Sequence, residues 1–302
     1  MTPSDNTLDE LVTEAWDADG ADLDLRSTAE LVELMNVEDA TVPAAVAGAT
    51  YAIAGAIDAI VARLQSGGRL IYVGAGTSGR LAVVDAAECE STFSTMPGQV
   101  VALIAGGTSS SPVEQEAAED DVESGRQALE QVDASAADAI VGVSASGRTP
   151  YVVGAMEHAR SQGALTVAVV NVQGSELGAV VEHEIAVVVG AEILAGSTRL
   201  KAGTAQKLIL NMLSTIAMIR IGKTYGNLMV DVYATNEKLH ARVRRIVRHA
   251  TAASPEAIED ALAASGGDAK VAIVSLLAQI DSATARERLA AAGGVVREAL
   301  GR

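Results

Sequence analysis

Residues 68–80 read GRLIYVGAGTSGR, an apolar stretch that runs directly into a glycine-rich loop. The apolar part, 70–73, is typical of a short buried β-strand. The loop, 74–80, carries three glycines and precedes a helical stretch. A strand joined to a helix in this way is typical of a parallel α/β sheet, and it leaves free backbone amides at the start of the helix.

Four more apolar segments alternate with helical stretches and predict further strands at 100–104, 139–143, 165–170 and 185–189. Continuous apolar strands of this kind are buried on both faces. We therefore expect fold class α/β: a three-layer parallel sheet, flavodoxin-like or Rossmann-like, with helices on both sides. One helix start is well marked, because Ser111, Pro112 and Glu114 form a capping-box pattern.

Helical patterns flank the predicted sheet. One starts at about Ser27, and a second long helix is expected from about Pro43 to about Leu64. After the sheet, an apolar helix is expected over 202–219 and a more basic helix over 228–248, followed by three or four short Ala-rich helices. We divide the chain into an acidic segment with helices (1–59), the α/β domain (60–223), a connecting helix (224–250) and a small helical, UBA-like subdomain (251–302).

The composition narrows the class of function. The 302 residues include 39 Asp and Glu but only 22 Lys and Arg, so the net charge is −17. A protein this acidic is not expected to bind nucleic acid. Aromatic residues make up 2%, too few for a stacking platform. A single cysteine, Cys89, excludes an intrachain disulfide. Because no long apolar run or signal-peptide pattern is found, we expect a cytoplasmic protein without a membrane partner.

The loop at 74–80 matches the G-x-G-x-x-G pattern of dinucleotide-binding proteins. Such proteins place an acidic residue at the end of the second strand to hold the ribose, whereas that strand ends here in 103–106, Leu-Ile-Ala-Gly. The cofactor interpretation therefore fails. What remains is a helix amino terminus with the backbone of Gly76 and the hydroxyls of Thr77 and Ser78, which suits a phosphate monoester.

A second hydroxyl-rich loop, 144–150, follows the predicted third strand. It offers the side chains of Ser144, Ser146 and Thr149 and the backbone of Gly147 to one anion. Alternatively, these hydroxyls only cap the next helix. Open α/β sheets bind ligands at the carboxyl ends of their strands, so two such loops together favour a ligand site.

The segments GAGTSGR (74–80) and SASGRTPY (144–151) resemble the sugar isomerase (SIS) domain, which binds phosphosugars. Longer blocks make the resemblance narrower, because the chain from about Ser27 onward is similar to the N-acetylmuramic acid 6-phosphate etherase family. The blocks that carry this resemblance are 68–89, 103–107, 141–152, 190–215 and 222–239. Where that family often has two prolines after the cysteine, this chain has Glu90 and Ser91.

The resemblance implies a lyase of cell-wall amino sugar recycling. It would cleave the D-lactyl ether of N-acetylmuramic acid 6-phosphate, giving N-acetylglucosamine 6-phosphate and D-lactate by elimination followed by addition of water. By resemblance, Glu119 is the base that removes the proton at C2 and Glu88 is the acid that protonates the departing lactate. The chemistry needs one acid and one base, without a metal or cofactor. The resemblance also implies a homodimer.

The residues around the two carboxylates give a separate view of these roles. We expect Glu88 just past a short helix, in an Ala-rich setting that would raise the pKa of its carboxyl. Glu119 is followed by Asp120 and Asp121, and such an acidic cluster would also raise its pKa. Without the resemblance, the residues alone favour a structural role for both, which for Glu119 is a place on a solvated helix face.

A third segment follows the predicted fifth strand. Glu192 stands where SIS-domain enzymes carry a substrate-side glutamate, and Ser197 and Lys201 are placed to contact the sugar or the lactyl carboxylate. A capping loop for the helix at 202–219 is an equal alternative. The four histidines, among them His240, have no metal-ligand spacing, so no metal site is predicted.

Charge is unevenly distributed along the chain. Residues 1–40 carry a net −11, whereas 197–249 carry a net +8. Because a substrate with a phosphate and a carboxylate needs local positive charge, we expect it near the basic segment. Two alternatives stay open: a non-catalytic SIS-domain regulator that binds a sugar phosphate, and a phosphosugar isomerase. Neither would release D-lactate.

Overall fold

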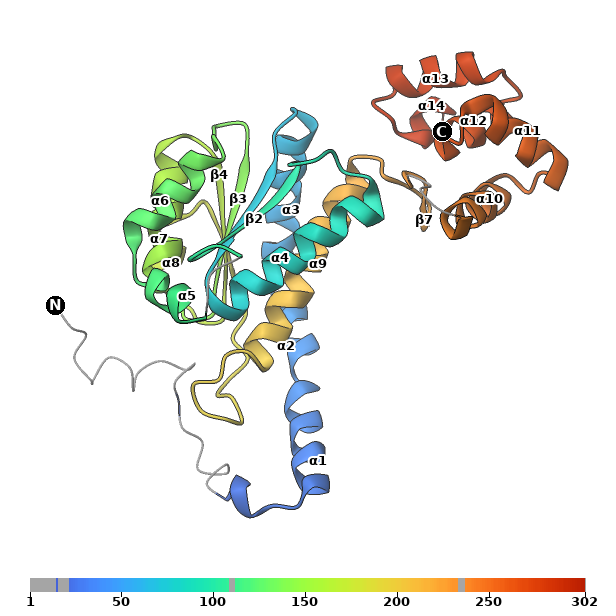
Figure 1. The fold of residues 1–302 in the computed structure, drawn as a ribbon. Helices are drawn as coiled ribbons and strands as arrows, with labels where there is room; N and C mark the ends of the chain where they lie inside the picture. Colours follow the sequence, from blue (N-terminus) through green and yellow to red (C-terminus); the bar gives the residue numbers. More distant parts are fainter. Residues whose placement is uncertain (1–14, 16–21, 109–111, 233–236, 302) are drawn as a thin grey trace. The chain divides into compact units, whose positions relative to one another are not determined.

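The computed structural model describes residues 15, 22–108, 112–232 and 237–301. Five strands form one parallel sheet in the order β2-β1-β3-β4-β5 (Figure 1). Their bounds are Leu70–Gly74 (β1), Val100–Ile104 (β2), Ala139–Ser144 (β3), Leu165–Val170 (β4) and His183–Ala186 (β5). Four predicted strands are confirmed. The fifth was expected at 185–189 and lies two to three residues earlier, at the four residues that pair with Val167–Val170 of β4.

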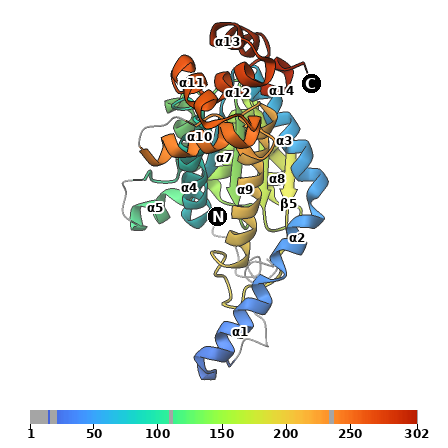
Figure 2. The ribbon, with the colours of Figure 1, turned by 90° about the vertical axis from the view of Figure 1, so that its right-hand side faces the viewer.

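Helices cover both faces of the sheet, which confirms the three-layer α/β class. On one face lie α3 (Thr50–Gln65), α4 (Gly76–Phe93) and α9 (Lys201–Arg220), seen side by side in Figures 1 and 2. On the other lie α6 (Val122–Gln131), α7 (Pro150–Ser161) and α8 (Glu176–Val180). The central strands β1, β3 and β4 are buried throughout. Burial of each Val, Leu or Ile side chain in these strands stabilises the folded state by about 1.5–3 kcal/mol.

Two buried carboxylates fasten this unit. Asp85 of α4 accepts hydrogen bonds from Tyr72 of β1 (2.9 Å) and Asn211 of α9 (2.6 Å), so helix and sheet hold one orientation. At the amino edge of the sheet, Asp138 accepts from the guanidinium of Arg69 (2.8 Å) and from the backbone of Ser135 (3.0 Å). Burial alone would raise the pKa of Asp138, but these hydrogen bonds outweigh it and hold that pKa below its usual range.

The amino-terminal helices differ from the expected pair. The helix α1 (Thr28–Asp39) begins with a capping box between Ser27 and Glu30, and none of its residues is buried. The long helix expected over 43–64 is divided at Ala49 into α2 (Val42–Gly48) and α3. In the described chain no single helix is long and apolar enough to cross a membrane; Thr28–Gly48 and Thr50–Gln65 pass that test only as a pair bent by 61°.

A second compact unit comprises Ala87–Pro97 and the chain from Thr215 on, whereas the part up to Ala86 and Gly98–Ser214 form the first. Its helices are α10 (Glu237–Thr251), α11 (Pro255–Ser265), α12 (Ala269–Ala278), α13 (Ser282–Ala291) and α14 (Val296–Ala299). They enclose an aliphatic core of their own. The basic helix expected over 228–248 is wrong at its start, because Leu228–Met229 (β7) pairs with Thr224–Tyr225 (β6) in a short hairpin. The four-part domain division stays a prediction.

Candidate active site

The candidate site lies at the carboxyl ends of the strands, where the strand order of the sheet reverses. The strands β2 and β3 follow β1 in the chain but pair with opposite sides of it. The loop after β1 therefore leads to α4, and the neighbouring loop after β3 leads away from it to α7. Ligands of open α/β sheets bind at such a point. In the first loop, Gly74 and Gly79 pack so closely that a Cβ on Gly74 would lie 2.8 Å from the nitrogen of Gly79, and Gly76 has a positive φ of +51°. Only glycines allow this tight passage from strand to helix.

The loop after β3 is held by its own hydroxyls. Ser144 and Thr149 are buried and hydrogen bonded to each other at 2.8 Å, and Ser144 also accepts from the amide of Gly147 (3.0 Å). A Cβ on Gly147 would meet the Cβ of Ser175 at 2.4 Å, so a side chain is excluded there. Ser146 is half-buried and accepts weakly from the amide of Arg148 (3.4 Å). Thr149 is the N-cap residue of α7 but makes no side-chain cap hydrogen bond, so these hydroxyls fasten the loop and do not cap the helix.

Glu119 reaches this point from a different element. It ends α5 (Pro112–Glu119), yet its Oε1 accepts from the hydroxyl of Thr149 at 3.5 Å. Its Oε2 lies 3.9 Å from where a Cβ on Gly76 would stand. The carboxylate therefore bonds to the second hydroxyl-rich loop, lies close to the first and is half-buried, unlike a residue on a solvated helix face. The expected helix cap at Ser111 lies outside the described residues.

A latch that sequence reasoning missed holds α5 in place. Gln115, one helical turn before Glu119, donates to the carbonyl of Gly107 (2.9 Å) and accepts from the guanidinium of Arg80 (3.0 Å). Gly106 lacks a side chain where one would meet the Cα of Gln115 at 2.9 Å. The end of β2, the start of α4 and α5 are thus tied together. The one signal in the sequence is the four-residue spacing between Gln115 and Glu119, which places both side chains on the same face of a helix.

Ser78 is turned toward a buried polar chain. Its hydroxyl donates to Gln206 of α9 (2.8 Å), and Gln206 donates to Asn171 (3.0 Å), which donates to the carbonyl of Val187 (3.0 Å). Thr77 lies beside α9 as well, 3.7 Å from the position of a Cβ on Gly203. The first loop is therefore anchored to the ends of β4 and β5, a link that spacing along the chain does not reveal.

The segment after β5 forms the cap of α9. The two carboxylate oxygens of buried Glu192 accept from the backbone amides of Lys201 and Ala202, both at 2.9 Å. Lys201 is itself buried, and its ammonium group pairs with Glu38 of α1. Ser197 lies half-buried in the same segment. The capping role, which the sequence left as an equal alternative, is therefore present in the structure.

Glu88 stands in a different setting. We expected it past a short helix, but α4 continues through it to Phe93, so that prediction is wrong. It is exposed, and its oxygen Oε2 accepts a long hydrogen bond of 3.5 Å from Ser91. Glu90 and Ser91 both lie within the helix, which two prolines would have interrupted. Glu88 follows Gly76 by more than three helical turns.

Among the described residues, no group of three or more His, Cys, Asp or Glu side chains is arranged to hold a metal ion. The fold and the paired hydroxyl loops define an SIS-type α/β domain. Residues 52–160 match the model of the Glucokinase regulatory protein N-terminal SIS domain. The solved phosphoheptose isomerase GmhA from Neisseria gonorrhoeae shares this fold, with a TM-score of 0.50 at 16% identity over 63% of this chain and 98% of that one.

Full-length relatives give the family. The chain is 58% identical to N-acetylmuramic acid 6-phosphate etherase of Streptomyces coelicolor over 293 residues, 97% of this chain and 94% of that protein. It is 57% identical to the etherase of Rubrobacter xylanophilus over 98% of both chains. The chain belongs to the N-acetylmuramic acid 6-phosphate etherase family.

Proposed function

We propose that this protein is a lyase that cleaves the D-lactyl ether of N-acetylmuramic acid 6-phosphate in cell-wall amino sugar recycling. In the open-chain sugar, a base takes the C2 proton beside the aldehyde, the C3–O bond breaks and D-lactate leaves with a proton from an acid. Water then adds across the C2–C3 double bond, giving N-acetylglucosamine 6-phosphate. The observation that carries this proposal is the carboxylate of Glu119, which accepts from Thr149 of one hydroxyl-rich loop and lies close to Gly76 of the other.

The two loops are proposed to bind the phosphate end of the substrate. The amino terminus of α4 offers backbone amides and the positive end of a helix dipole, both of which favour an anion. Hydroxyl and amide donors surround that point. In this proposal the substrate is held by Gly76, Thr77, Ser78, Ser144, Ser146, Gly147 and Thr149.

The cap of α9 is proposed to face the other end of the substrate. Lys201 already holds a carboxylate, that of Glu38, which supports a role in taking the lactyl carboxylate in its place. Glu192 keeps the helix start in position, and Ser197 adjoins the sugar. This places cationic charge where a net charge of −17 would otherwise repel the ligand.

Glu119 is proposed as the base at C2 and Glu88 as the acid for lactate. Exposure of Glu88, far along α4 from the first loop, supports a homodimer in which Glu88 of one copy serves the site of the other. A second copy would also remove water from Glu88, which keeps a carboxyl protonated. We place this homodimer in the cytoplasm, where a phosphorylated sugar is retained.

The test is incubation of the purified, folded protein with N-acetylmuramic acid 6-phosphate. We expect D-lactate and N-acetylglucosamine 6-phosphate in equal amounts. Binding of the substrate without D-lactate would contradict the lyase and favour a regulator. Conversion to a ketose phosphate that keeps the lactyl group would favour an isomerase.

A further inference from the structure

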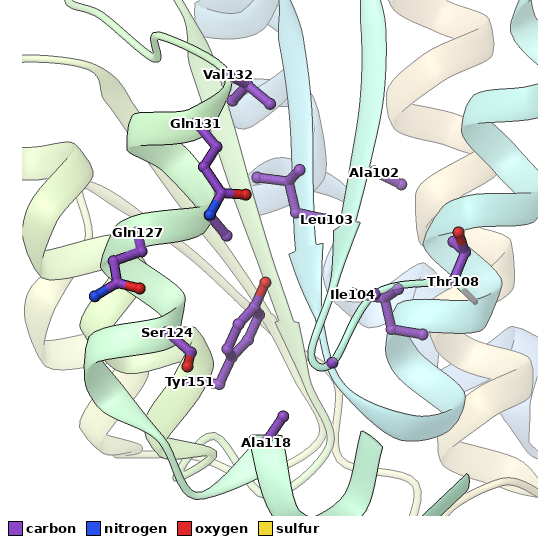
Figure 3. A pocket seen from close by; sticks show the side chains of 13 residues that line it. Ala102, Leu103, Ile104, Thr108, Ala118, Ser124, Gln127, Gln131, Val132 and Tyr151 are labelled. Atoms are coloured by element: carbon purple, nitrogen blue, oxygen red, sulfur yellow. The ribbon is translucent and has the colours of Figure 1, made fainter. Parts of the chain in front are cut away.

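A cavity of about 440 Å³ opens beside the edge of the sheet, apart from the two hydroxyl-rich loops (Figure 3). Its walls come from β2, α5 and α6, with Leu103 and Ala118 among the apolar residues and Gln131 among the polar ones. This volume falls in the range of small-molecule sites, about 300–1,000 Å³. Nothing in the proposed etherase reaction uses it.

One buried polar group points into this cavity. Tyr151, at the start of α7, is only 3% exposed, and its hydroxyl is directed into the space between Gln131 and Leu103 (Figure 3). Among the described residues, that hydroxyl makes no hydrogen bond. Burial raises the pKa of Tyr151 to about 12, so the phenol stays neutral and able to donate. Buried hydroxyls in folded proteins nearly always have a partner.

The backbone of β2 adds a donor and an acceptor. The carbonyl of Gln99 and the amide of Ala105 both bond to β1, and strand residues alternate in the side that they face. Ala102, which lines the cavity, therefore turns its N–H and C=O away from β1 at the open edge of the sheet. A primary carboxamide, with its oxygen and N–H on one side, matches this pair of groups.

The charge of the walls limits the ligand further. The thirteen described residues that line the cavity include no Asp, Glu, Lys, Arg or His. A phosphorylated or carboxylated ligand would lose its hydration there without gaining a counter-charge. The apolar and amide surfaces instead suit a flat, uncharged molecule.

We propose that this cavity is a second ligand site, which binds a small, flat, uncharged molecule carrying a primary carboxamide. The carboxamide pairs with the backbone of Ala102, the hydroxyl of Tyr151 donates to the ligand, and the ring lies on Leu103. Ala118 lines the cavity and the next residue is Glu119, so a ligand there would contact the helix that carries the proposed base.

Benzamide is the probe, and benzoate is its matched charged control. Titration of the full chain with each compound, followed by ligand-observed NMR, gives the dissociation constants without reference to enzyme activity. A fragment of this size is expected to bind at roughly 1 mM. Tyr151→Phe should weaken benzamide binding about tenfold, the effect of one lost hydrogen bond. Ala128→Leu, which fills the cavity from α6, should abolish it.

Tyr51→Phe is the control variant, because Tyr51 is 91% exposed on α3. Thermal melting of all three variants verifies that each is folded. Weak benzamide binding that Tyr151→Phe reduces, with no binding of benzoate, supports the site. No saturable benzamide binding, equal binding of benzoate, or binding unchanged by both cavity variants would overturn the proposal.

Discussion

The surroundings of Glu119 and of Glu88 differ in nearly every respect. Glu119 is half-buried, contacts Thr149, and sits on a helix that Gln115 ties to two other elements. Glu88 is exposed on the continuous helix α4 and has one long hydrogen bond to Ser91. One chain thus builds a complete environment for one carboxylate of the proposed pair and leaves the other open.

The difference has a chemical meaning. A base must be held within reach of the proton that it removes, and the latch and the loops supply that for Glu119. An acid must carry a proton at neutral pH, which for a carboxyl requires removal from water. Glu88 is exposed in a single copy, and the proposed homodimer would supply that removal from water.

The largest expected effects come from the carboxylates themselves. Glu119→Gln and Glu88→Gln should each lower D-lactate release about a thousandfold, since general acid–base groups contribute 10²–10⁴ in rate. Enzymatic D-lactate determination measures this. Glu184→Gln, a change at an exposed glutamate of β5, should stay within a few fold of the parent rate. Near-normal rates for Glu119→Gln would remove the base from the account.

If Glu88 of one copy serves the site that holds Glu119 of the other, two inactive variants should recover activity when they form mixed dimers. When Glu119→Gln and Glu88→Gln subunits are co-expressed, one of the two sites in each mixed dimer keeps both carboxylates. D-lactate release should then return to roughly a quarter of the parent rate. Co-expression of Glu119→Gln with the double variant is the control and should give no recovery. Absence of recovery in the first mixture would place both carboxylates of a site in one subunit.

The latch predicts a smaller effect on the Glu119 side alone. Gln115→Ala should lower kcat by roughly 10- to 100-fold with little change in KM, because positioning of a base acts on the chemical step. Steady-state kinetics separate the two constants. Gln162→Ala, at the exposed end of α7, is the matched control. A rise in KM at constant kcat would show that Gln115 serves binding instead of the base.

The smallest effect on activity is expected at Asp138, which lies at the amino ends of the strands, away from the candidate site. Asp138→Asn should lower the free energy of unfolding by about 2 kcal/mol, since Arg69 loses its charged partner. The pKa of Asp138 is lowered in the folded state, so its contribution is present above the pKa of the unfolded chain, about 3.9, and is lost as pH falls through the folded pKa.

Urea unfolding at pH 7 and at pH 3 measures this. The gap between parent and Asp138→Asn should narrow at the lower pH, while kcat at pH 7 stays near that of the parent. A gap that widens on acidification would reverse the assigned sign.

Local sequence signals predicted the sheet, the two loops and α9. Apolar runs such as 70–73 identify buried strands, and Gly74, Gly76 and Gly79 mark a turn that only glycine permits. The predictions of two helices were partly wrong. Ala49 divides a helix that the apolar spacing predicts as continuous, and residues 228–229 pair in a hairpin where a helix was expected.

The site was less accessible to sequence reasoning. The contact of Glu119 with Thr149 joins residues thirty positions apart, and the bond from Ser78 to Gln206 spans 128 positions. No periodicity encodes such contacts, because they depend on how helices rest on the sheet. The resemblance to a family named the carboxylates, whereas only the fold distinguishes the built environment of Glu119 from the open one of Glu88.

The central claim is that Glu119 removes the C2 proton, and exchange of that proton with solvent tests it most directly. In D₂O, NMR follows deuterium incorporation at C2 of N-acetylglucosamine 6-phosphate. The account predicts that Glu88→Gln still exchanges this proton and that Glu119→Gln does not. Exchange by Glu119→Gln but not by Glu88→Gln would contradict it.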